Sequence, residues 1–273
     1  MAQRYVRVQF QAGQLYYGLL QADQTVQVLD APPWLIGQVT ETELTPDSYI
    51  MLAPCAPSKV VAVGQNYAKH VAEMGGEAPS EPLLFIKPST TVISAGSVIR
   101  YPAASQRVDY EGELALIIGD RCVDCTPEVA RSKIWGYTIA NDVTARDLQR
   151  HDGQWTRAKG FDTFCPLGPW IVRELPPAAK LQTFLNNDPE PVQSASIDEM
   201  VFGPAALVSF ISQVMTLLPG DVVLTGTPAG VGPLQIGDRV RVEIEGIGSL
   251  ENEVKPRNSS ELLTDLNKVK AGS

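Results

Sequence analysis

Short apolar, β-branched runs recur along the chain, and glycine and proline residues separate them. Runs of this length and composition indicate strands. The run 238–245 (DRVRVEIE) also alternates apolar and charged residues, as a strand with one face in water does. The runs that we predict to be strands are Lys59–Gly64, Pro82–Lys87, Glu113–Gly119, Ile134–Ala140, Val222–Gly226 and Asp238–Glu245.

Helical patterns are fewer. Pro204–Leu218 begins with proline at a first-turn position, and Pro219-Gly220 follows as a stop signal. Thr126–Ile134 has a threonine N-cap followed by Pro127, and Asn66–Met74 precedes two glycines. Together with the strands, these segments predict a β-rich α+β fold.

The first 53 residues differ from the rest of the chain. They contain two short strand patterns, Tyr5–Phe10 and Leu15–Leu20, followed by a polar stretch that we interpret as helical. The proline-containing segment Ala53–Pro57 is typical of a linker. We therefore predict a small N-terminal α/β domain at residues 1–53, a catalytic domain at 57–257 and a C-terminal tail at 258–273.

Charge and cysteine content limit the possible functions. The formal net charge is −9, which argues against nucleic acid and anionic membrane surfaces as partners. The four cysteines are irregularly spaced and imply no disulfide framework, which favours a reducing compartment. No secretory leader pattern and no long apolar run is evident. We predict a cytoplasmic protein.

Carboxylates gather at the ends of two predicted strands. Glu111 and Glu113 are two residues apart, so in a strand their side chains share a face, and Asp109 has the same spacing. Asp142 ends the apolar run that contains Ile134–Ala140. Carboxylates without histidine or cysteine suit Mg²⁺ or Mn²⁺. The alternative is a set of independent rim carboxylates on an acidic protein.

Three further segments contain candidate polar groups. His70 and Glu73 are spaced i and i+3 on a predicted helix, where they could pair as a general base, or form an exposed contact. Lys159 lies between Trp155 and Phe161 and could meet a substrate oxyanion, or be a surface lysine. The glycine-rich segment 224–233 lacks a phosphate-loop ending, but its backbone N–H groups and Thr227 could cradle a carboxylate.

These motifs resemble the fumarylacetoacetate hydrolase family over roughly residues 59–254. The resemblance is carried, in order, by GQNYAKHVAEMG, PLLFIKPST, DYEGELALIIG, GYTIANDVTARDLQ, WTRAKGFDTFCPLGP and GDVVLTGTPAGVG. The chain looks most similar to the short acylpyruvase and oxaloacetate decarboxylase type members. The resemblance implies a mixed β-sheet roll or barrel, usually in a homodimer.

The resemblance also implies roles for individual residues. It implies Mg²⁺ or Mn²⁺ held by Glu111, Glu113 and Asp142, and a catalytic dyad of His70 and Glu73 on a lid that orders over substrate. It further implies that Lys159 is an active-site lysine, that Gln149 contacts substrate and that Thr227 binds its carboxylate. Arg146 lies in the same motif as Gln149, among the substrate-binding positions, and is interpreted as structural or supporting. The role of Asp109 stays open.

The implied substrate is a 2-oxo acid that reacts through a metal-stabilised enolate. Oxaloacetate decarboxylation or keto–enol tautomerisation and acylpyruvate C–C bond hydrolysis share this enolate. An isomerase of unsaturated hydroxy-dicarboxylates, of the 2-hydroxyhepta-2,4-diene-1,7-dioate type, and a non-catalytic ligand-binding member are the alternatives.

Overall fold

The computed structural model describes residues 2–258. The predicted C-terminal tail, 258–273, lies outside the described residues except for Asn258. No helix within the described part of the chain is long and apolar enough to cross a membrane.

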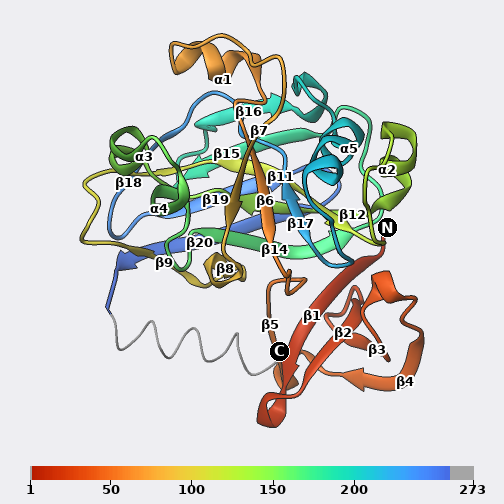
Figure 1. Ribbon diagram of the computed structural model, residues 1–273. Coiled ribbons are helices and arrows are strands. Elements are labelled where there is room, and N and C mark those ends of the chain that lie inside the picture. Colours follow the sequence, from red (N-terminus) through yellow and green to blue (C-terminus); the bar gives the residue numbers. More distant parts are fainter. Residues whose placement is uncertain (1, 259–273) are drawn as a thin grey trace.

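The first strands form a small antiparallel unit that continues the main sheet of the molecule (Figure 1). β1 pairs with β14 (Cys165–Val172) through Tyr5 and Ile171, which places the N-terminal strands in the same sheet as the strands of the main domain. Apolar side chains of this unit, including Val6, Val8 and Val26, form a separate small core. The strands are β1 (Arg4–Phe10), β2 (Leu15–Leu20), β3 (Val26–Leu29), β4 (Val39–Leu44) and β5 (Tyr49–Met51).

The polar helical stretch predicted after Leu20 is wrong. The described residues there form β3, β4 and β5, with short 3-10 turns at Pro33–Leu35 and Pro46–Ser48. A further 3-10 turn, Gln11–Gly13, connects β1 to β2. β4 has the sequence VTETEL, in which Val39, Thr40 and Thr42 are β-branched and favour a strand. Pairing with β3 outweighs the polar character that suggested a helix.

The central sheet has twelve strands and mixed pairing. From β14 it continues in the order β12, β11, β17, β6 and β7, while β8 pairs with β14 in parallel and β6 with β17 in parallel. These strands confirm five of the predicted apolar runs, with ends shifted by one or two residues. Their bounds are β6 (Val60–Gly64), β7 (Leu83–Lys87), β8 (Val92–Ile93), β11 (Gly112–Ile118), β12 (Ile134–Asn141) and β17 (Val222–Leu224).

Two smaller sheets complete the mixed roll. One pairs β13, β10 and β18, and the other runs β16, β15, β19, β20 and β9. Leu181, Val242 and Leu250 of the second sheet pack against Leu114 and Leu116 of β11 in one core cluster. The bounds are β9 (Val98–Tyr101), β10 (Val108–Tyr110), β13 (Thr144–Ala145), β15 (Lys180–Leu185), β16 (Gln193–Ser196), β18 (Gly232–Leu234), β19 (Arg239–Ile244) and β20 (Gly248–Pro256).

Five α-helices occur within the described residues. The three predicted helices are confirmed as shorter ones, and the Thr126 hydroxyl accepts the capping hydrogen bond from the Val129 N–H. The helix begun at Pro204 ends at Val214 because Met215 turns extended and Leu217 pairs with Cys122. The bounds are α1 (Ala68–Glu73), α2 (Pro127–Lys133), α3 (Arg146–Asp152), α4 (Thr156–Lys159) and α5 (Pro204–Val214), with further 3-10 turns at Ser89–Thr91 and Ile197–Glu199.

Strand β11 passes through the middle of the molecule and is buried on both faces. Leu114, Leu116 and Ile118 pack into one core cluster, whereas Ala115 and Ile117 pack into another. Burial on both faces explains why this run is continuously apolar instead of alternating. The face that carries Ala115 and Ile117 also carries Glu113, near the start of the strand, and Glu113 lines the same pocket as His70 of α1.

Candidate metal centre and active site

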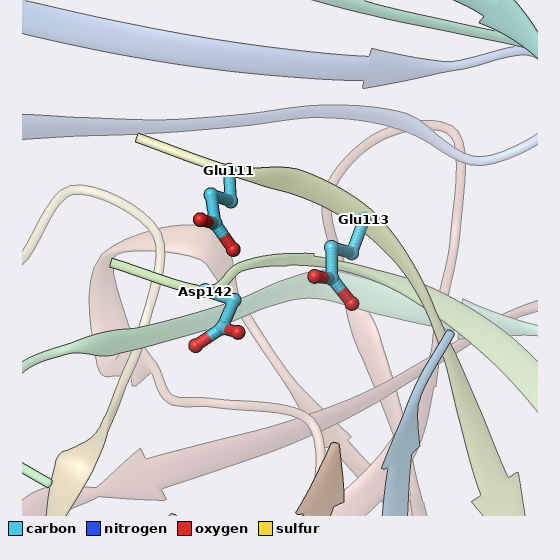
Figure 2. Close-up of side chains that lie close together, drawn as sticks. All are labelled: Glu111, Glu113 and Asp142. Atoms are coloured by element: carbon cyan, nitrogen blue, oxygen red, sulfur yellow. The ribbon is translucent and has the colours of Figure 1, made fainter. Parts of the chain in front are cut away.

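Glu111, Glu113 and Asp142 converge at the ends of two neighbouring strands, as Figure 2 shows. One ligand oxygen of each carboxylate lies within 4.8 Å of the others, and all three residues are buried. β11 pairs with β12 so that Gly112 lies opposite Asn141, and the Asp142 N–H donates to the Glu111 carbonyl at 2.8 Å. The register of β11 with β12 therefore brings Asp142 beside Glu111 and Glu113, whose two-residue spacing predicts that their side chains share a face.

Buried cations surround these carboxylates. The Lys159 ammonium donates to Glu111 Oε2 at 2.8 Å and to Asp142 Oδ2 at 2.6 Å. The Lys87 ammonium donates to Asp142 Oδ1 at 2.5 Å and to the Val143 carbonyl at 3.2 Å. Arg146 donates to the remaining oxygen of Glu111. Each oxygen of Glu111 and Asp142 thus has a cationic donor, and each keeps a second lone pair for another ligand.

Glu113 has a different environment. Its Oε2 accepts from the Gly226 N–H at 2.7 Å, and within the described residues it forms no ion pair. Burial and the neighbouring Asp142 and Glu111 charges raise the pKa of Glu113 well above its usual range. Burial opposes ionisation of Glu111 as well, but the Lys159 and Arg146 charges outweigh it and lower the pKa of that carboxyl. Glu113 is therefore the carboxylate that most lacks a positive partner.

The donor set fits a hard divalent cation. Three buried carboxylates offer oxygen ligands at one place, and the unbalanced charge of Glu113 is what a cation would neutralise. Glu111, Glu113 and Asp142 are the residues that would hold such an ion.

Asp109 has a structural role next to this group. Its carboxylate is fully buried and accepts from Arg146 Nε at 2.9 Å and from Arg107 Nε at 2.9 Å. Arg146 in turn contacts Glu111 and donates to Gln149 Oε1 at 2.6 Å. Asp109 thereby orients Arg146, which lies against one of the candidate metal ligands.

His70 and Glu73 face each other on α1. The distance between His70 Nδ1 and Glu73 Oε2 is 3.3 Å, and the His70 side chain is buried while that of Glu73 is partly exposed. A carboxylate at Nδ1 favours the tautomer with the proton on that nitrogen, which leaves Nε2 as the proton acceptor. This geometry suits a general base.

The glycine-rich segment holds carboxylates of the protein itself. The Gly226 N–H donates to Glu113, and the Gly230 N–H donates to Glu73 at 3.1 Å and 3.2 Å from its two oxygens. The glycine pattern predicts that these N–H groups cradle a carboxylate, and the carboxylates that they contact here belong to a candidate metal ligand and to the predicted dyad. One loop thus positions both groups.

Most of the candidate residues line one small pocket, of about 50 Å³. Thr227 lines it, although its hydroxyl donates to the Gly112 carbonyl at 2.9 Å and accepts from Gln193 Nε2 at 2.8 Å. Gln149 and Glu73 are not part of the lining. The lining consists of Val63, Gly64, Gln65, His70, Met74, Phe85, Glu111, Glu113, Asp142, Arg146, Trp155, Lys159 and Thr227.

Sequence reasoning missed several site residues. Lys87 ends a strand run and is fully buried against Asp142, and a charge closing an apolar run could have indicated it. Phe85 and Trp155 form an aromatic contact with ring centroids 5.2 Å apart. No local pattern marks these aromatics because they meet only when α4 packs near β7.

The main part of the chain matches a known family. Residues 59–255 match the model of the fumarylacetoacetate (FAA) hydrolase C-terminal domain, and residues 3–54 match the model described as Rv2993c-like, N-terminal. This chain belongs to the fumarylacetoacetate hydrolase family. The resemblance inferred from its motifs is confirmed, and the strand-rich fold with an N-terminal unit agrees with it.

Relatives and solved structures that resemble this chain carry different reaction names. "Oxaloacetate tautomerase fahd2, mitochondrial" of Xenopus laevis is 40% identical over 218 residues, covering 75% of this chain and 68% of that protein. The structure of 2-hydroxyhepta-2,4-diene-1,7-dioate isomerase from Mycobacterium marinum is 42% identical, with a TM-score of 0.85 and coverage of 94% of this chain and 100% of that chain.

A third similarity concerns the metal. Fumarylpyruvate hydrolase from Pseudomonas aeruginosa, in complex with Mn²⁺ and pyruvate, is 34% identical with a TM-score of 0.70, covering 76% of this chain and 92% of that chain. The family and the names of these relatives support an enzyme of the class to which these tautomerases, isomerases and hydrolases belong.

Proposed function

We propose that this protein is a Mg²⁺- or Mn²⁺-dependent enzyme that acts on short 2-oxo acids through an enolate. Oxaloacetate is the proposed substrate, by keto–enol tautomerisation or decarboxylation, with acylpyruvate C–C bond hydrolysis as a second activity. The observation that carries this proposal is the pocket in which three buried carboxylates, Lys159 and His70 meet. The names of the relatives support the same class of substrate.

A divalent ion bound by the three carboxylates would supply Lewis-acid polarisation of the 2-oxo group. The protein supplies the remaining charge. Lys159 is held by Glu111 and Asp142 in a site without bulk water, where a positive charge stabilises a developing oxyanion most strongly. Asp142 keeps a second cation, Lys87, when Lys159 turns toward substrate.

The proposed proton acceptor is His70 Nε2. Glu73 holds the imidazole through Nδ1, and Gly230 holds Glu73, so the base is oriented before substrate arrives. In tautomerisation of the keto form, His70 takes a proton from C3 and delivers it to the 2-oxo oxygen, which gives the enol, and the reverse direction retraces these transfers. In hydrolysis, His70 takes a proton from the water that attacks the distal carbonyl. The bond between that carbonyl carbon and C3 then breaks, its electron pair goes to C3 as the pyruvate enolate, the distal part leaves as a carboxylic acid, and the proton on His70 passes to C3.

A substrate panel tests the proposal. The purified protein is assayed with oxaloacetate, acetylpyruvate and fumarylpyruvate in Mg²⁺, Mn²⁺ and chelator, with product analysis and with enol loss followed by absorbance. We expect turnover of oxaloacetate or of an acylpyruvate that the chelator abolishes. Turnover that is unaffected by chelator would contradict the metal assignment.

The alternatives give different results when a 2-hydroxyhepta-2,4-diene-1,7-dioate-type substrate is added to the panel. An isomerase of unsaturated hydroxy-dicarboxylates, which the Mycobacterium marinum structure favours, would convert that class without breaking a C–C bond. A non-catalytic member would bind ligand and leave every substrate unchanged. Either result would replace the proposed reaction.

A further inference from the structure

Five of the residues that line the pocket have no polar side-chain group other than an indole N–H. Val63 and Gly64 come from the end of β6, Phe85 from β7, Met74 from the residue after α1, and Trp155 from the residue before α4. The other lining residues include the carboxylates and Lys159. We expect an acylpyruvate whose carboxylate and 2-oxo group meet these charged residues to place its acyl end against the apolar ones.

Trp155 occupies its position because residue 64 is glycine. A Cβ atom added at Gly64 would lie 2.6 Å from Trp155 Cζ3 and 2.9 Å from Trp155 Cη2, which is closer than real contacts allow. The next nearest atom, Leu83 Cδ2, is 3.5 Å away at an ordinary contact distance. Gly64 closes β6 opposite Leu83, and its backbone has no left-handed conformation that would itself exclude alanine. The close approach of the indole is therefore the main obstacle to a side chain at this position.

Phe85 also contacts the indole. The two rings meet edge to face, with an interplanar angle of 70° and centroids 5.2 Å apart. The Lys159 ammonium lies 4.9 Å from the centroid of the Phe85 ring, so the same aromatic pair adjoins the candidate catalytic lysine. The indole thus packs against both Gly64 and Phe85, and Phe85 in turn adjoins the Lys159 ammonium.

We infer that Trp155, seated on Gly64 and braced by Phe85, limits the length of the substrate's distal arm and restricts the enzyme to short 2-oxo acids. This inference rests on the function proposed above for the three carboxylates and Lys159. It assigns Trp155 as a specificity-determining residue and Gly64 as a residue that positions it. Apolar pockets discriminate by about 10- to 200-fold per methylene when the extra group has no space.

Binding of unreactive ligands tests the inference separately from catalysis. Calorimetric titrations with Mg²⁺ present would use pyruvate, 2-oxobutanoate, 2-oxopentanoate and 2-oxohexanoate. For the wild type we expect pyruvate to bind and affinity to fall along the series by about tenfold or more. In Trp155→Ala we expect the longer acids to bind at least as well as pyruvate, with pyruvate changed by less than about threefold.

Gly64→Ala provides a test that a general loss of packing would not satisfy. Alone, it should displace the indole toward the pocket and weaken pyruvate binding. The double variant Gly64→Ala/Trp155→Ala should recover the length profile of Trp155→Ala, because the added methyl group then has no ring to contact. Leu83→Ala is the control, since this residue is exposed, lies on the same strand as Phe85 and does not line the pocket.

The outcomes separate the two proposals. Pyruvate binding with the same length profile in wild type and Trp155→Ala would overturn the role of Trp155 and leave the proposed function intact. Failure of the double variant to recover would overturn the role of Gly64. Absence of pyruvate binding in the wild type, with Mg²⁺ bound, would overturn the proposed function and this inference together. Trp155→Phe is the second variant if the alanine variant does not fold, and it should shift the profile in the same direction.

Discussion

At the scale of single residues, the three candidate metal ligands differ in what balances their charge. Glu111 and Asp142 contact Lys159, whereas Glu113 accepts a backbone hydrogen bond from Gly226. Burial and two neighbouring carboxylates raise the pKa of Glu113. Its charge is therefore the one that a cation would most directly stabilise.

This difference predicts a pH-dependent metal affinity. A Glu113 pKa raised above the unfolded value means that the metal-free fold retains a proton there, and that its stability falls as pH rises toward the raised pKa. Metal must displace that proton, so Mg²⁺ affinity should increase with pH and binding should release a proton. Calorimetry in buffers of different ionisation enthalpy measures the proton count.

Glu113→Gln is the matching variant. It should weaken Mg²⁺ binding by more than the about 10- to 100-fold typical of losing a partner outside the ligand set. It should also remove the proton release. Unchanged affinity in a metal titration would contradict the assignment of Glu113.

A second prediction at this scale concerns His70. His70→Ala should lower turnover by about 10²- to 10⁴-fold, the usual contribution of a positioned acid–base group, while Mg²⁺ affinity stays within a few-fold. His70 contacts Glu73 and not the carboxylate cluster in the hydrogen bonds of the described residues, which is why binding and turnover should separate. Wild-type rates in this variant would remove His70 from the mechanism.

At the scale of elements, one loop positions two functional groups. Segment 225–231 connects β17 to β18, and its backbone donates to Glu113 through Gly226 and to Glu73 through Gly230. The glycines of this loop are visible in the sequence as a turn after a strand. The structure shows that its N–H groups anchor carboxylates from β11 and α1.

Gly230 gives a test of this anchoring. It has a φ of +98°, and a Cβ atom there would lie 1.9 Å from the Val192 carbonyl oxygen. Gly230→Ala should therefore move the loop, release Glu73 and lower turnover. Gly237 is the matched control, because it has a φ of +97° with no atom within 4 Å of an added Cβ.

Both alanine variants should incur left-handed backbone strain of about 1–2 kcal/mol, seen as a lower unfolding temperature. Only Gly230→Ala should lose more enzymatic activity than this backbone strain explains. Equal activity losses in the two variants would show that the loop does not act through Glu73.

At the scale of the whole molecule, the N-terminal unit is joined to the main domain by strand pairing as well as by the linker. β1 extends the central sheet at β14, and Tyr5 and Trp34 pack on Trp135 with ring centroids 4.8 Å and 6.0 Å away. Paired in this way, β14 does not present an open edge. Figure 1 shows this unit at the opposite end of the molecule from α1, so its proposed contribution is to the sheet and not to the pocket.

The homodimer implied by the family resemblance stays a prediction. Light scattering after size-exclusion chromatography should give twice the 29.6 kDa of one chain. The measured mass should stay at that of two chains across a tenfold dilution series. A mass of one chain at every concentration would contradict it.

The amino-acid sequence by itself determined the local elements and part of the site. Strand and helix patterns are local, so apolar runs and caps located most elements to within a few residues, and the two-residue period put Glu111 and Glu113 on one face. Asp142 and Lys159 were identified by motif, and the structure brings them to the same pocket.

Only the tertiary structure decided which distant groups meet. The polar stretch after Leu20 became strands because pairing with β3 outweighed its composition. Lys87 reached Asp142, and Trp155 reached Gly64 and Phe85, through the register of β6 with β7 and the packing of α4 beside them. Such contacts join residues far apart in sequence, and their energy depends on burial and geometry that no local pattern encodes.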